Sequence, residues 1–512
     1  MDGGSDSALR AHPCVPCLRY EIRIGLATSG SMSVALEGRL PSRLSDRIYT
    51  GFASLMFTQI ALAAAIWTVL VGGALPYAGD LKISVAGFIC GAMLGTGPVI
   101  LGSVIPCFRY GVDLMDISKA VLGTRGVFVT LAGFVVMSLG WSSIGLAMIC
   151  QGIGSLSVTN AVLSANQAEP LILLVGFLAI IVVFFLLRRG IRLIQRVNHF
   201  VGPVFILFTV GSLFLMLRQF GFGGLFESRI PAEQVLTTDP RTTFAYGFEF
   251  GVTMSLAWYP YLGGIFRLVK SPSHIVGPTM IGGTILGICF TVAVSAFAAS
   301  RFGSPDPSVW FLQLAGPLFG TIVVIGILLL SLAAICMVVY VVAIALQQYG
   351  LLARMSWPLL VTLVLAPLLI VVMNASWVMD HVMTFATFGG LIFFSLSGVM
   401  LTDLWLLRGG RLEVVHLFVG NDSGHYWYWG GVNWCAVFVV AAGVAIYLVM
   451  YDPITMQAGD GFRYFGAAFP VILISGFLYY VLARLCVIPS GRGGYRLPRE
   501  KSAGDPVFRV GL

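Results

Sequence analysis

The residues best suited to chemistry in this chain include one acid inside a long apolar stretch. Glu249 lies in AYGFEFGVTMSLAWYP. If that stretch crosses a membrane, an ionised side chain near the bilayer centre costs at least about 2.5–3.5 kcal/mol, so intramembrane carboxylates usually face a cavity or a partner and often relay protons. We therefore predict that Glu249 is a proton-coupling site. A place in the outer vestibule is the alternative, because only about five residues separate it from the expected start of its span.

Two tryptophans share a second pattern that suggests binding. Trp67 and Trp258 are each followed, after four residues, by a pair of glycines, and Pro260 lies inside the second copy. Glycine and proline in corresponding spans of two halves indicate interrupted helices around a midplane binding site. Interruptions at 63–67 and 257–261 would expose backbone N–H and C=O groups, which cargo and ions can satisfy.

The elements that carry these residues must be membrane helices. The chain of 512 residues is 58% hydrophobic and only 10% charged, and its mean hydropathy is +0.93, which is too apolar for a soluble protein. A membrane helix needs roughly 20 mainly apolar residues to cross about 30 Å of hydrocarbon. That length predicts an all-α polytopic membrane protein with about twelve spans, near 51–75, 83–106, 127–150, 169–187, 199–217, 244–266, 276–299, 317–346, 357–373, 377–401, 432–450 and 464–486.

The basic residues predict how the chain is oriented. With a cytosolic N-terminus, about 24 of the 30 Lys and Arg residues fall on the inside, which indicates that both termini are cytosolic. The net charge of +8 is therefore a sign of topology and does not indicate nucleic-acid binding. We expect a multi-pass protein of the cell membrane, whether plasma or inner, in contact with the lipid bilayer.

The two ends of the chain differ from its apolar middle. Residues 1–47 are polar and predict a disordered cytosolic tail, 48–486 should form a transmembrane domain, and 487–512 should form a cytosolic C-terminal tail. Cys14 and Cys17 make one CxxC near His12 with no second ligand pair, so we expect no metal site.

A set of motifs near the C-terminal end resembles the signature of the nucleobase:cation symporter-1 family. GVMLTD closes the tenth expected span at 398–403, Arg408, Gly410 and Arg411 follow in a loop, and YWYWGGVNW occupies 426–434. The resemblance implies a LeuT-type fold with a 5+5 inverted repeat and two extra helices. Repeat one would cover about 48–218, repeat two about 243–403, and the extra helices about 432–486.

The family resemblance also implies a site. In the family a planar heterocycle stacks between aromatic rings, one of them a tryptophan on the third span, which here is Trp141 in GWSSIGLAM. The eighth span, SLAAICMVVYV, departs from members that use sodium, because alanines replace their hydroxyl ligands. The implied cargo residues are Trp141, Gly145, Ala64, Trp67, Phe250, Gly251 and Trp258, and the implied coupling residues are Glu249, Ala63, Ile66, Ala333 and Ala334.

Two further predictions concern the signature itself. Asp403 and Arg408 should form a structural or gating polar pair at the cytosolic end of the tenth span. The aromatic residues of the box, Tyr426 and Tyr428 among them, are expected to form an interfacial belt that anchors span eleven.

The resulting prediction is a secondary active symporter that imports a nucleobase or a related planar heterocycle by alternating access. Spans one, two, six and seven would rock as a bundle against spans three, four, eight and nine. The only cofactor expected is the coupling cation, H⁺ or Na⁺. The alternatives are a transporter of the same fold for another solute, such as a vitamin or an amino acid, or a membrane-embedded enzyme. We do not expect an enzyme, because Glu249 has no reactive partner at helical spacing. The oligomeric state stays open.

Overall fold

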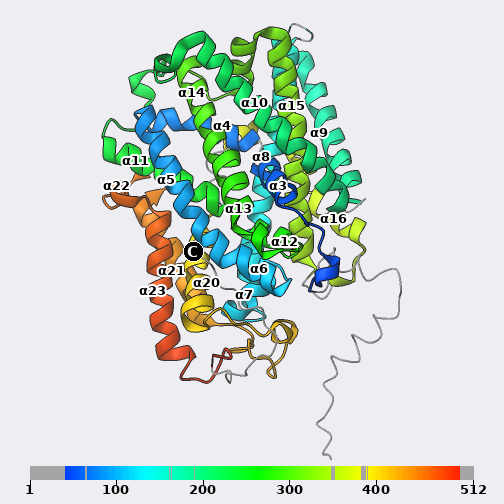
Figure 1. Ribbon diagram of the computed structural model, residues 1–512, viewed down its shortest axis with the longest axis vertical. Helices are drawn as coiled ribbons and strands as arrows, with labels where there is room; N and C mark the ends of the chain where they lie inside the picture. The colour runs from blue at the N-terminus through cyan, green and yellow to red at the C-terminus, as the bar shows by residue number, and fades with distance from the viewer. Residues whose placement is uncertain are drawn as a thin grey trace, which may run out of the picture.

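The computed structural model describes residues 41–495 except 64–65, 161, 163, 189–190, 348–351, 382–387 and 389. Most of this part of the chain is helical, and its helices run mainly along the long axis of the molecule (Figure 1). The only strands among the described residues are the short antiparallel pair β1 (Tyr451–Asp452) and β2 (Gln457–Ala458). The predicted tails, with Cys14 and Cys17, lie largely outside the described residues.

Seven of the described helices are long and apolar enough to cross a membrane. They are confirmed as the framework of an all-α polytopic fold, whereas the total of twelve spans stays a prediction. The long helices are α5 (Leu81–Val99) with its continuation to Tyr110, α8 (Val127–Thr159), α9 (Ala165–Arg188), α10 (Ile191–Gly224), π-helix η5 (Thr279–Phe290) with α14 (Thr291–Phe302), α15 (Pro307–Leu346), and α23 (Ala468–Leu482) with its continuation to Val487. Shorter apolar helices cover Trp357–Met373, Leu391–Leu407 and Trp434–Met450.

Two helices are interrupted where the sequence predicts it. The first span consists of α3 (Phe52–Ala63) and α4 (Ile66–Ala78), whose axes are bent by 56°. The sixth consists of α11 (Pro240–Leu256) and α12 (Tyr259–Phe266). Pro260 lies in the first turn of α12, where its missing N–H costs no helical hydrogen bond. Both predicted breaks are confirmed.

The predicted tenth span, 377–401, falls partly on residues outside the described part of the chain, 382–387 and 389. On either side of that gap the structure has α18 (Ala375–Asp380) and α20 (Leu391–Leu401), and α20 continues as π-helix η7 (Thr402–Leu407). Gly390 is the N-cap of α20, a position that glycine tolerates.

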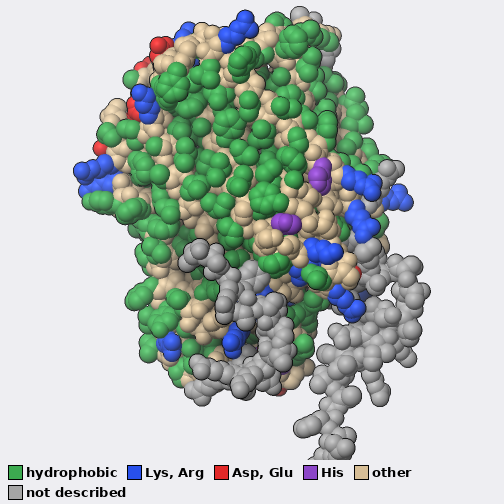
Figure 2. Space-filling view, viewed as in Figure 1, with side chains coloured by type: hydrophobic (Ala, Val, Ile, Leu, Met, Phe, Trp, Pro, Cys, Tyr) green, Lys and Arg blue, Asp and Glu red, His purple; other side chains and the backbone are tan. Residues whose placement is uncertain are grey.

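The outward side chains suit a lipid surface. Hydrophobic residues cover most of the face in Figure 2, and Lys and Arg lie at its rim and in its lower half. Side chains that would meet lipid are largely exposed on several long helices, including Val136, Phe185, Phe214, Leu329 and Phe477.

Helices α5 and α11 approach each other through glycines on both sides. A Cβ atom at Gly91 would collide with the carbonyl oxygen of Phe248, and one at Gly251 would collide with that of Phe88. Such small-residue faces let helix backbones pack closely in membranes. Gly251, predicted to contact cargo, thus packs against α5.

Gly91→Ala should destabilise this helix pair, because the added methyl group meets backbone that cannot rotate away. We expect a loss of about 1–3 kcal/mol, the usual cost of overpacking, measured as a lower Tm of the purified protein. Gly97→Ala on the same helix is the matched control, since nothing lies within 4 Å of its added Cβ and alanine favours helix by up to about 1 kcal/mol. Equal Tm values for the two variants would contradict close packing at Gly91.

Candidate transport site

Three tryptophan rings from different helices meet at the helix breaks. Trp67 on α4 lies 5.9 Å from Trp141 on α8 and 6.3 Å from Trp258, measured between ring centroids. The planes are tilted by 59° and 45°. Trp258 is the N-cap of α12 and so occupies the interruption of the sixth span. The structure therefore brings together the three tryptophans that the sequence singles out.

Trp67 fills the room that a flat ligand would need. A Cβ atom at Gly145 would lie 3.0 Å from the Trp67 ring, so glycine there makes space for the indole of Trp67. The cavity left between the rings has a volume of only about 10 Å³, roughly that of one water molecule. A heterocycle can enter only if a side chain moves. The residues around the cavity are Trp67, Trp141, Met254, Ala257, Trp258, Tyr261 and Val338.

This aromatic site offers few polar partners to a ligand. Tyr261 is its one hydroxyl-bearing residue, and the hydroxyl lies 2.8 Å from that of Ser138. On the side of α15 the site presents Val338. Cargo held here would gain mainly stacking and burial.

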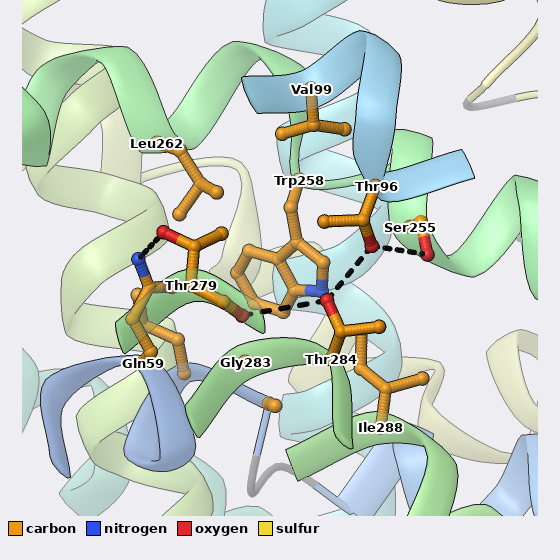
Figure 3. A pocket seen from close by; sticks show the side chains of 12 residues that line it. Gln59, Thr96, Val99, Ser255, Trp258, Leu262, Thr279, Gly283, Thr284 and Ile288 are labelled. Carbon is orange, nitrogen blue, oxygen red and sulfur yellow. Dashed lines mark hydrogen bonds between the residues drawn. The ribbon is translucent and has the colours of Figure 1, made fainter. Parts of the chain in front are cut away.

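A second cavity lies next to Trp258 and is lined partly by hydroxyl groups (Figure 3). Its volume is about 20 Å³. The hydroxyl of Thr96 on α5 lies 2.8 Å from that of Thr284 on η5 and 3.4 Å from that of Ser255 on α11. Gln59 on α3 lies beside Thr279, with 3.5 Å from Nε2 to Oγ1.

The sequence analysis missed these polar residues. Their signal is a hydroxyl or an amide inside each of four apolar helices, which belong to the first, second, sixth and seventh spans. Each is unremarkable alone, since a lone Thr or Ser usually bonds to its own helix. Only packing shows that they converge.

The remaining predicted residues have varied positions. Ala63 lines the hydroxyl cavity, and Ala333 and Ala334 are buried on α15. Ile66 begins α4, and Ala64 lies outside the described residues. Neither Phe250 nor Gly251 lines either cavity, because their place on α11 turns Gly251 toward α5.

Glu249 binds the extra helices and lines neither cavity. Its carboxylate accepts hydrogen bonds from the hydroxyl of Tyr447 on α21 (Trp434–Met450), at 2.8 Å, and from the backbone N–H groups of Ala467 and Ala468, at 2.7 and 2.9 Å. Those N–H groups form the start of α23, where the helix dipole also favours an anion. The side chain is only 2% exposed. Its coupling role stays a prediction, and its contacts are those of an anchor.

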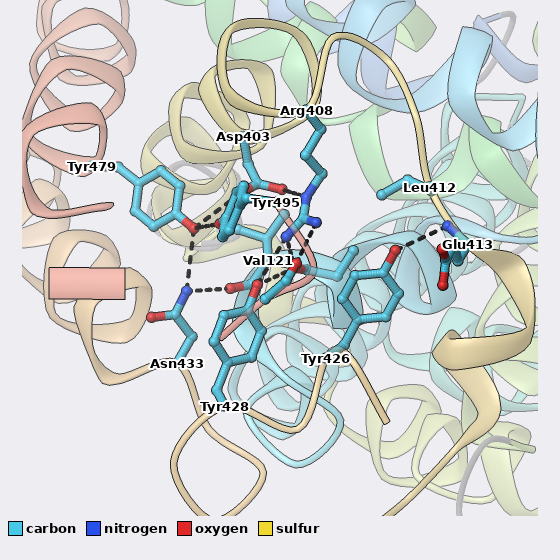
Figure 4. A network of polar contacts seen from close by, with 12 residues as sticks. Val121, Asp403, Arg408, Leu412, Glu413, Tyr426, Tyr428, Asn433, Tyr479 and Tyr495 are labelled. Atoms are coloured by element: carbon cyan, nitrogen blue, oxygen red, sulfur yellow. Dashed lines mark hydrogen bonds and ion pairs between the residues drawn. The ribbon is translucent and has the colours of Figure 1, made fainter. Parts of the chain in front are cut away.

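A buried ion pair holds the opposite end of the tenth helix (Figure 4). The Nε of Arg408 lies 2.5 Å from a carboxylate oxygen of Asp403, and Arg408 also donates to the carbonyls of Ala120 and Gly493. The hydroxyls of Tyr479 and Tyr495 donate to the other carboxylate oxygen. The predicted polar pair of Asp403 and Arg408 is confirmed as a buried ion pair.

The predicted aromatic belt is wrong for two of its members. Tyr426 and Tyr428 are buried, and their hydroxyls bind the backbone N–H of Glu413 and the carbonyl of Ala120, respectively. Asn433 donates from its amide to the carbonyl of Val121. The signature therefore folds against α7 (Leu114–Leu122), where the Tyr428 hydroxyl and the Asn433 amide have backbone partners. Hydropathy did not reveal this connecting helix.

A carboxylate and two imidazoles meet in the same loop, a group the sequence analysis did not select. Glu413 lies 3.2 Å from Nε2 of His416 and 2.8 Å from Nδ1 of His425. The backbone N–H of His425 points at Nδ1 of His416, which leaves the proton on Nε2, so that nitrogen offers no lone pair to a metal. Burial, and then His425, lowers the pKa of His416. The spacing E-x2-H-x8-H was the available signal.

Residues 53–478 match the family model described as permease for cytosine/purines, uracil, thiamine and allantoin. Among curated proteins, the hydantoin permease of Microbacterium maritypicum is 22% identical over 373 residues, which are 67% of this chain and 70% of that protein.

The fold is also similar to solved transporter structures. The inward-facing conformation of Mhp1 gives a TM-score of 0.69 at 17% identity, over 90% of this chain and 97% of Mhp1. A closed conformation of Mhp1, a nucleobase-cation-symport-1 family transporter with bromovinylhydantoin bound, gives 0.68 at 17% identity over 88% and 96%. These likenesses confirm the predicted LeuT-type fold.

Asp403→Asn should strongly destabilise the protein, because Arg408 would keep a buried charge without its counter-ion. We expect a loss of about 3–5 kcal/mol, measured by thermal unfolding in detergent. Glu227→Gln is the matched control: its partner is Arg301, but the Glu227 side chain is 65% exposed, so the loss should be at most about 1 kcal/mol. A Tm shift no larger than that of the control would show that the buried pair contributes little.

Glu249→Gln separates coupling from anchoring. The amide keeps one acceptor oxygen but turns an N–H group toward donors, so we expect a loss of about 1–3 kcal/mol in stability. Because the carboxylate faces α21 and α23, we expect proton-driven uptake in proteoliposomes to keep its dependence on the pH gradient. Loss of that dependence at unchanged Tm would instead assign the coupling role to Glu249.

Proposed function

The chain belongs to the family of permeases for cytosine, purines, uracil, thiamine and allantoin, and from that membership we propose that it carries a planar heterocycle across a cell membrane together with a cation. The observation that supports this cargo class is the meeting of Trp67, Trp141 and Trp258 at two helix breaks. Rings of this kind bind flat, partly apolar molecules by stacking. The hydantoin permease named above is named for a compound of the same type, because hydantoin is a flat heterocycle.

Cargo would bind between Trp141 and Trp258 after Trp67 leaves the space between them. The Trp67 indole is attached to α4, just beyond the break, so a change in the angle between α3 and α4 moves it. Its departure would exchange one aromatic ring for another, and the site would stay filled. Trp67 then acts as a built-in competitor that favours cargo able to stack at least as well.

Alternating access would follow from rocking of the helices that carry the breaks. Cargo and cation shift the equilibrium between outward and inward states only by their difference in affinity for the two. The close backbone packing of α5 on α11 makes these helices move as one body. We further propose that both termini are cytosolic, as the basic residues predict.

Trp141→Ala and Trp258→Ala should each raise the KM for cargo by about tenfold or more, through loss of stacking and burial. The measurement is uptake of labelled cytosine, uracil, adenine, hypoxanthine, allantoin and hydantoin into proteoliposomes, with sodium and proton gradients applied separately. Trp434→Ala is the control, because that ring is 61% exposed and lines neither cavity. Absence of uptake of every compound under both gradients would overturn the proposed cargo class. Equal KM values for all variants would overturn the proposed site.

A further inference from the structure

We propose that the hydroxyl-lined cavity beside Trp258 binds a small monovalent cation, Na⁺. The inference rests on the proposed function for its role in coupling, whereas the binding itself can be measured without cargo. The site would lie within the bundle of the first, second, sixth and seventh spans and is distinct from the positions on α15 that the family resemblance suggests.

The candidate ligands come from three helices and converge on one point (Figure 3). Thr96 from α5 has its hydroxyl oxygen 2.8 Å from that of Thr284 on η5 and 3.4 Å from that of Ser255 on α11. All three side chains are buried. Oxygens this close in an apolar surrounding can share one ligand.

Each of these hydroxyl groups has a backbone carbonyl that can accept its proton. Thr96 and Ser255 both donate to the carbonyl of Ala92, at 2.8 and 2.9 Å, and Thr279 donates to that of Ile275 at 2.8 Å. Thr284 lies 3.4 Å from the carbonyl of Thr279 and 2.8 Å from the hydroxyl of Thr96, and can donate to either. A hydroxyl has one proton and two lone pairs, so each of these groups has acceptor capacity left. Gln59 approaches Thr279 through its amide nitrogen, which leaves its carbonyl oxygen unused in that contact. The wall therefore presents acceptors, which suit a cation.

The chemistry and size of the wall select the type of cation. None of the residues that line the cavity is Asp, Glu, His or Cys, the ligands that hold divalent and transition metals. Neutral oxygens and the carbonyls freed at broken helices are what transporters use for sodium. A volume of about 20 Å³ admits an ion or about one water molecule, but no heterocycle.

The position of the cavity connects it to cargo. Trp258 lines both this cavity and the aromatic one. An ion among Thr96, Ser255 and Thr284 would pull α5, α11 and η5 together and support the Trp258 indole on the side away from the cargo. Ion occupancy would thereby fix the position of the ring on which cargo stacks.

The test is sodium-dependent stability of the full chain in detergent without cargo. We compare Tm in NaCl, KCl and choline chloride at equal ionic strength, because a ligand that binds only the folded state raises Tm, and the rise grows with the logarithm of ligand concentration over Kd once the site is near saturation. Sodium should raise the Tm of the native protein more than the other salts do. Thr96→Val and Thr284→Val should raise the apparent Kd for Na⁺ by about tenfold or more, as expected for a lost ligand.

Two further variants keep the result decisive. Thr291→Val removes a buried hydroxyl on the same span that does not line the cavity, and it should keep the sodium effect. Thr284→Ser restores the oxygen and should do so too, even if valine impairs folding. A native protein indifferent to Na⁺, or Thr96→Val and Thr284→Val proteins that respond as Thr291→Val does, would overturn the site. A normal sodium effect without heterocycle uptake would refute the cargo assignment alone.

Discussion

The constraint on which the rest of this structure depends is that backbone polar groups inside a membrane need partners. A continuous helix satisfies its own N–H and C=O groups, but the first and sixth spans stop and restart within the bundle. Their free ends can be tolerated only where protein, ion or cargo supplies the missing hydrogen bonds. Both cavities border these two spans. The unpaired backbone groups that make the breaks costly are therefore also the groups that can bind ion or cargo.

The two cavities divide the tasks of recognition because of how they are lined. The aromatic cavity is lined by indole and aliphatic side chains and favours binding of flat molecules that stack. The hydroxyl-lined cavity offers oxygen ligands and favours binding of a cation. Trp258 is their common wall, so neither cavity can change shape without affecting the other. Coupling between ion and cargo then needs no distant pathway, because it passes through one side chain at a helix break.

Trp141 came from the family resemblance, whereas composition and local pattern predicted the membrane helices, both interruptions, Trp67 and Trp258, because each of these depends on residues near in sequence. The hydroxyl cavity could not be predicted in that way. Thr96, Ser255 and Thr284 are separated by up to 188 residues, and each alone resembles an ordinary helix residue. For Glu249 the sequence predicted a transport role, because intramembrane acids often serve transport. The structure instead surrounds this carboxylate with hydrogen-bond donors from Tyr447 and the start of α23. The burial of Tyr426 and Tyr428 depended in the same way on α7, whose position only tertiary packing decides.

The anchors at the two ends of the extra helices limit how the bundle can move. Glu249 ties α11, a helix of the sixth span, to α21 and α23, while Asp403 and Arg408 tie the end of the tenth helix to α7 and to Tyr479 of α23. Motion of α11 relative to α23 would strip a buried carboxylate of several hydrogen bonds, each costly to lose without water. The extra helices must therefore travel with α11. A hinge at the breaks beside Trp67 and Trp258 leaves these anchors intact, and at the first break it has to accommodate the buried hydrogen bond from the Thr68 hydroxyl to the carbonyl of Ala63.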